Sequence, residues 1–205
     1  MDHKRLIKDS LDHFHIPLSE EELAKLVRFI EELARWNRTV NLVGIKNVDR
    51  VCAELLADSF FVYTFIIDGK RVIDLGSGSG IAGIPFAILN RSLEICSVDS
   101  NLKKIQFQRH IRRSLGILNF LPIWGRVEAI DPLKGDRLVA KAYGTSEAIL
   151  AAADRHLIKG GLVYIVKGKA ENEVSREGYS IEKSVDYSLP GVTKGYRLLI
   201  YKKIS

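Results

Sequence analysis

A short apolar run followed by an acid and regularly spaced glycines is the segment of this chain most able to do chemistry. It reads Val72-Ile73-Asp74-Leu75-Gly76-Ser77-Gly78-Ser79-Gly80. Glycines in such a turn let the backbone adopt positive φ and approach a ligand closely, and parallel α/β sheets bind ligands at the carboxyl ends of their strands. We expect Asp74 to face a cationic group, and Gly76 and Gly78 to contact the ligand.

A second acid, Asp99, ends the next predicted strand. Its carboxylate is placed to accept hydrogen bonds from both hydroxyls of a ribose. A ligand that combines a nucleoside with a positive charge would satisfy both acids. S-adenosylmethionine has a ribose, an ammonium group and a sulfonium group, so we expect it to bind here as a methyl donor.

The same segment permits two other interpretations. Residues 78–83 match the GxGxxG pattern of dinucleotide sites, which would make the protein an NAD-dependent oxidoreductase. That pattern begins later after the strand than expected, and the carboxylate of Asp74 opposes a pyrophosphate, which requires bare amides at a helix N-terminus. The glycines could also merely form a turn. We therefore favour the methyl donor.

The loop after the third predicted strand is the next candidate. It reads Trp124-Gly125-Arg126-Val127-Glu128 and would flank the base of a nucleoside. The backbone amides of Val127 and Glu128 are placed to read an adenine edge. Without the glycine segment, an ordinary polar turn would be the preferred interpretation.

Beyond residue 68, short apolar strands alternate with helices, which predicts a mostly parallel sheet with helices on both faces. The predicted strands are Arg71–Leu75, Glu94–Val98, Asn119–Trp124, Arg137–Ala142 and Leu162–Lys167, with helices at Ile84–Leu89, Leu102–Leu115 and Ser146–Leu157. Gly160-Gly161 is predicted as a tight turn, and Ile181–Tyr187 and Arg197–Tyr201 as an antiparallel closing pair. The expected fold class is α/β, a Rossmann-like class I S-adenosylmethionine-dependent methyltransferase.

The N-terminal residues have helical apolar spacing. A first helix ends before Pro17, and a second opens at Ser19, which can form a capping box with Glu22. A third is predicted from near Asp49 through Tyr63. Because no flexible linker marks the change near residue 68, we predict a single domain over residues 1–205, with a helical N-terminal extension (1–67) on a Rossmann-like core (68–205).

Composition limits the partners and the compartment. The chain has 205 residues and a net charge of +6, which favours polyanionic partners such as nucleic acid. No apolar stretch approaches the roughly 20 residues of a membrane span, and the charged N-terminus is unlike a secretion signal. Cys52 and Cys96 form no CxxC motif, and His13 and His15 lie on different sides of a predicted helix. We expect a cytoplasmic protein with no membrane segment and no metal.

Several segments together resemble the motifs of one family. They are Trp36-Asn37-Arg38-Thr39-Val40-Asn41-Leu42, Asp58-Ser59, residues 74–80 with Gly83-Ile84-Pro85, Val98-Asp99-Ser100 with residues 103–107, Gly125-Arg126-Val127-Glu128, and Leu189-Pro190-Gly191 with Arg197-Leu198. The family is RsmG, also called glucose-inhibited division protein B, the guanine-N7 methyltransferases of small-subunit (16S) ribosomal RNA. The likeness covers nearly the whole chain.

The resemblance implies an enzyme whose substrate is small-subunit rRNA or the ribosomal subunit. It also implies that the methyl donor contacts Gly76, Ile81, Val127, Glu128 and Lys141.

The chain departs from the family pattern at several of these places. Ala82 replaces a usual proline, Lys141 a usual arginine, and Glu54-Leu55 a usual Arg-His pair. Lysine keeps the charge of arginine but loses its planar fork. A second possibility therefore stays open, an RNA-binding protein on a methyltransferase-like fold with weakened activity. The target nucleotide, the substrate state and the oligomeric state also stay open.

The segment after the fourth predicted strand indicates the kind of methylation. Lys141-Ala142-Tyr143-Gly144 has neither the Asn/Asp-Pro-Pro-aromatic loop of amine methylases nor the cysteine of ring-carbon methylases. Guanine N7 needs neither, because its lone pair lies in the ring plane and no proton is lost; positioning can supply most of the rate. We assign no general base, and we give Lys141 a positioning role opposite a carboxylate or phosphate.

A basic helix is the candidate RNA contact. Lys103, Lys104, Arg109, Arg112 and Arg113 fall on one predicted helix with no acid among them, a pattern that can neutralise phosphates. We expect Lys103, Lys104 and Arg109 to bind RNA. Trp36, at a predicted helix end, is expected to be a core residue rather than a base-stacking one.

Overall fold

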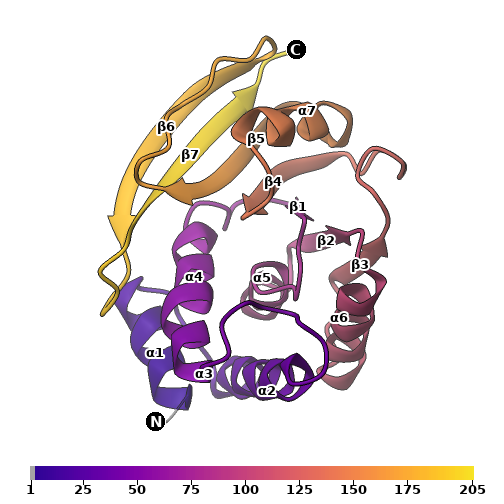
Figure 1. The fold of residues 1–205 in the computed structure, drawn as a ribbon. Coiled ribbons are helices and arrows are strands. Elements are labelled where there is room, and N and C mark those ends of the chain that lie inside the picture. The colour runs from indigo at the N-terminus through magenta and orange to yellow at the C-terminus, as the bar shows by residue number, and fades with distance from the viewer. Residues whose placement is uncertain (1–2) are drawn as a thin grey trace.

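The protein is built on a seven-stranded sheet, in a computed structural model that describes residues 3–205. The strand order is β3-β2-β1-β4-β5-β7-β6; β1 to β5 run parallel, and β7 pairs antiparallel with both β5 and β6 (Figure 1). The predicted α/β class and the closing antiparallel pair are therefore confirmed. The elements in chain order are α1 (His3–His13), α2 (Glu20–Asn37), α3 (Val48–Arg50), the π-helical turn η1 (Val51–Leu56), α4 (Ala57–Tyr63), β1 (Arg71–Leu75), α5 (Gly83–Leu89), β2 (Glu94–Asp99), α6 (Leu102–Ser114), β3 (Phe120–Trp124), β4 (Gly135–Lys141), α7 (Ser146–His156), β5 (Leu157–Gly168), β6 (Tyr179–Ser188) and β7 (Gly195–Lys203).

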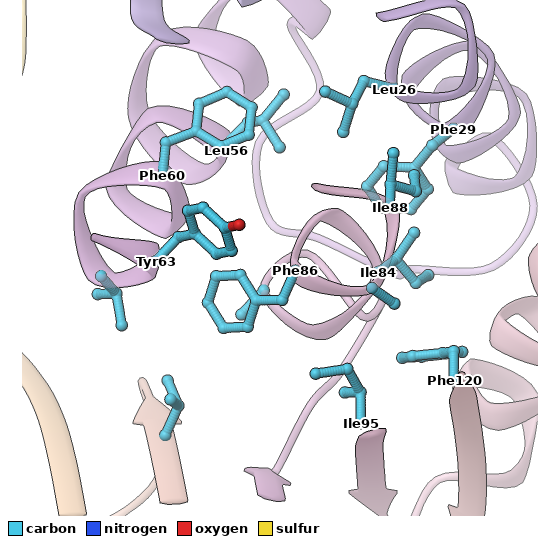
Figure 2. Close-up of a cluster of buried hydrophobic side chains, with 14 of the residues drawn as sticks. Leu26, Phe29, Leu56, Phe60, Tyr63, Ile84, Phe86, Ile88, Ile95 and Phe120 are labelled. Carbon is cyan, nitrogen blue, oxygen red and sulfur yellow. The ribbon is translucent and has the colours of Figure 1, made fainter. Parts of the chain in front are cut away.

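Side chains that alternate along the strands form two hydrophobic clusters, one on each face of the sheet. In β1, Val72 belongs to the larger cluster and Ile73 to the smaller one, because successive side chains of a strand point to opposite faces. The larger cluster also contains residues of α1, α2 and α4. In Figure 2, Phe86 of α5 lies between Phe60 of α4 and Ile95 of β2. The N-terminal helices and the sheet thus bury α5 between them.

The N-terminal helices begin where their capping residues predict. Ser19 Oγ accepts a hydrogen bond from the Glu22 amide (3.3 Å), and Glu22 Oε2 accepts one from the Ser19 amide (2.7 Å), which confirms the capping box. Asn47 caps the next helical stretch through the Arg50 amide (3.0 Å). This stretch continues through η1 and α4 to Tyr63, as predicted.

The fifth strand differs from the prediction at Gly160-Gly161. We predicted a tight turn there, but β5 begins directly after α7 at Leu157 and includes both glycines. Leu157 pairs with Gly135, and the next pair is Leu162 with Arg137, so a bulge takes up the extra residues. Gly160 has φ +79°, a value that glycine adopts without strain. The two glycines that predicted a turn therefore lie in a bulge of β5.

The described part of the chain, residues 3–205, contains no helix that is both long and apolar enough to cross a membrane.

Candidate active site

A cavity of about 310 Å³ opens where β1, β2, β3 and β4 end, at the carboxyl edge of the parallel part of the sheet. The structure brings together four of the residues predicted to bind the methyl donor, Gly76, Asp99, Val127 and Glu128, in the lining of this cavity. Lys104, a predicted RNA contact, lines it as well. This is the edge at which sheets of this class bind their ligands.

The glycine loop between β1 and α5 is held by a buried side chain from α6. Gln108 is fully buried, and its Nε2 donates to Ser77 Oγ (2.8 Å) and to the Gly78 carbonyl (2.8 Å). Gly76 and Gly78 have φ of +64° and +58°, as a tight loop requires. Gln108 was not among the predicted site residues; the signal for it was a glutamine on the otherwise apolar buried face of α6.

Asp74 lies beneath the glycine loop and does not line the cavity. We expected its carboxylate to face a ligand; instead Asp74 is 2% exposed and accepts a hydrogen bond from the Gly83 amide (3.0 Å). Burial raises the pKa of Asp74 to about 7, against the opposing effects of the Gly83 amide and the charge of Lys141. In this structure the carboxylate therefore fixes the start of α5. It also takes up an amide of the GxGxxG segment, which disfavours a pyrophosphate at that helix end.

Asp99 is half-buried at the end of β2 and faces the cavity. Its Oδ2 accepts from the Gly78 amide (2.8 Å), and its Oδ1 accepts from the Asn101 amide (2.7 Å). A carboxylate has about four lone-pair sites, so both oxygens keep capacity for hydroxyl donors. This arrangement fits the expected contact with a ribose.

Helix α7 holds the loop after β3 from behind. His156 is buried; its Nε2 lies 2.8 Å from the Val127 carbonyl, and its Nδ1 accepts from the Leu133 amide (3.3 Å). Because Nδ1 accepts a backbone N–H, the proton is on Nε2 and the ring is neutral. Arg155 donates to the Glu128 carbonyl (3.1 Å). Neither His156 nor Arg155 was among the predicted site residues.

The Val127 and Glu128 carbonyls of this loop are hydrogen-bonded to α7, but the backbone N–H groups of the same two residues are not used in the described part of the chain. Within residues 3–205, no hydrogen bond uses the amides of Val127 and Glu128, whose residues line the cavity. Two unpaired donors at a cavity wall are suited to the acceptor nitrogens of a purine base. The loop therefore fits the expected adenine contact.

Lys141 ends β4 but points away from the cavity. Its Nζ contacts Asp58 Oδ2 (2.8 Å), Ser59 Oγ (2.8 Å) and the Leu55 carbonyl (3.0 Å). The other oxygen of Asp58 accepts from the Tyr187 hydroxyl. Lys141 thus faces a carboxylate, as we expected from its charge, whereas the donor contact implied by the family resemblance is not in the cavity lining.

The remaining predicted site residues do not line this cavity. Gly78 and Ile81 belong to the glycine loop but do not line the cavity, and Lys103 and Arg109 are exposed on α6. Trp36 is half-buried, with its ring 5.5 Å from that of Phe107. This packing confirms the prediction that Trp36 is a core residue.

The described part of the chain holds no group of three histidine, cysteine or acidic side chains that is close enough to bind a metal ion. Cys52 and Cys96 are both buried and unbridged.

Comparison with solved structures places the fold. The chain superposes on TrmN from Thermus thermophilus with a TM-score of 0.60 at 17% identity, covering 73% of this chain and 49% of that one. It superposes on M. jannaschii TYW2 in complex with AdoMet with a TM-score of 0.55 at 13% identity, covering 73% of this chain and 76% of that one. At these identities the likeness concerns the fold alone, which is that of class I methyltransferases.

Sequence comparison identifies the family. The chain is 30% identical over 197 residues to the ribosomal RNA small subunit methyltransferase G of Shewanella woodyi, covering 94% of this chain and 95% of that one. It is 31% identical over 195 residues to the protein of the same name from Chromobacterium violaceum, covering 93% of each chain. Residues 22–200 match the family described as GidB, rRNA small subunit methyltransferase G. The chain therefore belongs to the GidB family, the rRNA small subunit methyltransferases G.

Proposed function

We propose that this protein methylates N7 of a guanine in the rRNA of the small ribosomal subunit, in the cytoplasm, with S-adenosylmethionine as methyl donor. One observation carries the proposal. In a chain of the GidB family, the cavity at the carboxyl edge of the sheet is lined by a glycine that lets a ligand approach the backbone and by a carboxylate placed for ribose hydroxyls. It is also lined by two residues whose backbone amides have no hydrogen-bond partner within residues 3–205. These groups come from Gly76, Asp99 and the Val127-Glu128 pair.

The residues that line the cavity fit the chemistry of the donor. Asp99 is placed for the ribose hydroxyls, and the amides of Val127 and Glu128 for the adenine edge. Gly76 lines the cavity and has no side chain, and the ring of Tyr143 lies against it. When bound, S-adenosylmethionine supplies an electrophilic methyl group on its sulfonium. The protein's task is then to orient the acceptor atom toward that methyl.

A guanine N7 acceptor makes few chemical demands on the protein. Its in-plane lone pair attacks without prior loss of a proton, so alignment and proximity supply the rate. Lys141 fits a positioning role, because its charge is already matched by Asp58 at 2.8 Å. In this proposal Lys141 joins β4 to α4 and thereby supports the segment that follows β4 at the cavity.

The exposed face of α6 is the proposed RNA contact. Lys103, Lys104 and Arg109 have no acidic partner within residues 3–205, and Lys104 lies at the cavity itself. Cations placed along a helix that starts at the active site can neutralise phosphates on either side of the target nucleotide. We also propose that the helical N-terminal extension (1–67) and the Rossmann-like core (68–205) form a single domain.

The test is methyl transfer to rRNA by the purified protein. Small subunits and naked small-subunit rRNA from cells that lack the protein are incubated with labelled S-adenosylmethionine, and modified guanines are mapped by cleavage at 7-methylguanine. We expect one guanine to gain a methyl group. RNA binding without methyl incorporation would favour the RNA-binding alternative, and thermal stabilisation by NAD but not by S-adenosylmethionine would favour the oxidoreductase.

A further inference from the structure

We propose that Tyr143 is the aromatic platform on which the target guanine stacks during methyl transfer, an inference that rests on the proposed function. Tyr143 follows β4 and is half-buried in the wall of the cavity. Its ring lies directly on Gly76: a Cβ atom added to Gly76 would be 2.2 Å from Tyr143 Cδ2. The ring therefore stands at the glycine that we assign to donor binding.

The segment that carries Tyr143 is fixed at both ends. On one side, Lys141 Nζ is held by Asp58 (2.8 Å). On the other side, Lys167 Nζ donates to the Gly144 carbonyl (2.8 Å). The two neighbours of Tyr143 also have left-handed backbone, with φ of +53° at Ala142 and +49° at Gly144. A ring presented by a fixed segment binds a planar base with little loss of conformational entropy.

Ala142 is the unusual residue in this segment. An alanine pays a steric penalty in the left-handed region that glycine does not. Such a conformation persists only where the surroundings determine it, and here the anchors of Lys141 and Gly144 do so. The backbone is thus strained at the position that directs Tyr143 into the cavity.

The chemistry of the ring suits the charge that develops on the substrate. Methyl transfer forms the N7–C bond, breaks the C–S bond and leaves the electron pair on sulfur, so the positive charge passes to the purine. An aromatic face attracts a cation, and the carboxylates of Asp99 and Glu128 line the same cavity. Burial, with the charges of Glu128 and Asp99, raises the pKa of Tyr143, so its phenol stays neutral. Within the described residues its hydroxyl has no hydrogen-bond partner.

Two substitutions separate stacking from packing. Tyr143→Phe keeps the ring, and Tyr143→Leu keeps an apolar side chain against Gly76 without a π face. We expect kcat/KM for rRNA to fall about 10- to 100-fold in Tyr143→Leu, the loss that follows from removing a base–aromatic stack. We expect it to stay within about threefold of the wild type in Tyr143→Phe, since both rings stack. The dissociation constant for S-adenosylmethionine, measured by calorimetry, should change by less than about threefold in both.

The control is Phe65→Leu, which removes a half-buried ring outside the cavity and should leave kcat/KM unchanged. Equal activity of Tyr143→Leu and the wild type would overturn the inference, as would a loss that is matched by weaker donor binding. If Tyr143→Leu does not fold, fluorinated phenylalanines at position 143 replace it; a rate that falls with each added fluorine supports the platform, and a constant rate overturns it. An inactive wild type would instead contradict the proposed function itself.

Discussion

Lys141 and Asp58 form a buried ion pair that joins the end of β4 to α4. Their Nζ and Oδ2 atoms are 2.8 Å apart, and the side chains are 12% and 5% exposed. Lys141→Met leaves the buried carboxylate without its cation, and removing one partner of such a pair costs about 3–5 kcal/mol of unfolding free energy. Urea titration checks this value. The double variant Lys141→Met, Asp58→Leu should recover most of the loss, because it removes both charges; a single variant as stable as the wild type would contradict the buried pairing.

Gly76 and Gly78 offer a matched pair of substitutions in the glycine loop. Both have positive φ, so alanine costs about 1–2 kcal/mol at either position. At Gly78 the added Cβ meets no atom closer than Lys104 Nζ at 3.8 Å, whereas at Gly76 it collides with Tyr143. By calorimetry, we expect Gly78→Ala to weaken S-adenosylmethionine binding about tenfold and Gly76→Ala at least about tenfold more. Equal effects would show that the collision is relieved without cost.

His156 supports the loop after β3 but does not line the cavity. His156→Leu removes the partners of the Val127 carbonyl and the Leu133 amide, and each unsatisfied buried group costs about 1–3 kcal/mol. The loop should loosen, and donor affinity should fall about tenfold. His13→Leu, at an exposed histidine that ends α1, is the control. Unchanged affinity in His156→Leu would mean that the loop holds its shape without this contact.

Asp74 should make stability depend on pH. Its pKa is raised from 3.8 to about 7 in the folded protein, so between those values the folded state binds a proton that the unfolded state has lost. The unfolding free energy therefore falls as pH rises from about 4 to 7, by at most about 4 kcal/mol from this group. Asp74→Asn keeps an acceptor for the Gly83 amide and should remove this part of the dependence. Urea titrations of both proteins at pH 5 and pH 8 measure the difference; parallel changes would show that Asp74 does not titrate in this window.

The basic face of α6 should appear in the salt dependence of RNA binding. Lys104→Ala and Arg109→Ala should each lower the slope of log affinity against log salt by roughly 0.7–0.9, the value for one phosphate contact. Lys159→Ala, at an exposed lysine of β5, should leave the slope unchanged. Fluorescence anisotropy with labelled rRNA at several salt concentrations provides the slopes. The same slope in all three variants would place the RNA elsewhere.

Much of the fold could be predicted from the sequence because patterns of neighbouring residues specify it. The apolar runs of β1 and β2 are buried on both faces, so their composition marked them as strands. The capping box at Ser19 and the positive-φ glycines likewise depend on neighbours in the chain. Gly160 shows the limit of such reading, since a glycine alone does not distinguish a turn from a bulge.

The hydrogen bonds and the ion pair that support the site could not be predicted from the sequence, because they join residues far apart in the chain. His156 and Val127, Gln108 and Ser77, and Lys141 and Asp58 meet only once the sheet is assembled. The same holds for Asp74: its place next to the glycines was predictable, but its orientation toward Gly83 depends on how α5 packs on the sheet. Sequence thus indicated which segments form the cavity, and tertiary packing decided which side chains face it.

The order of strands has a consequence for how the chain is made. β7 is the last strand in the chain order, yet it pairs with β5 on one side and β6 on the other. During vectorial synthesis β6 emerges first and has no neighbour to join, while β5 presents an open edge. The sheet closes only when residues 195–203 leave the exit tunnel, and closure also brings Tyr187 to Asp58. A chain that lacks β7 therefore keeps an open edge at β5 and cannot attach β6 to the sheet.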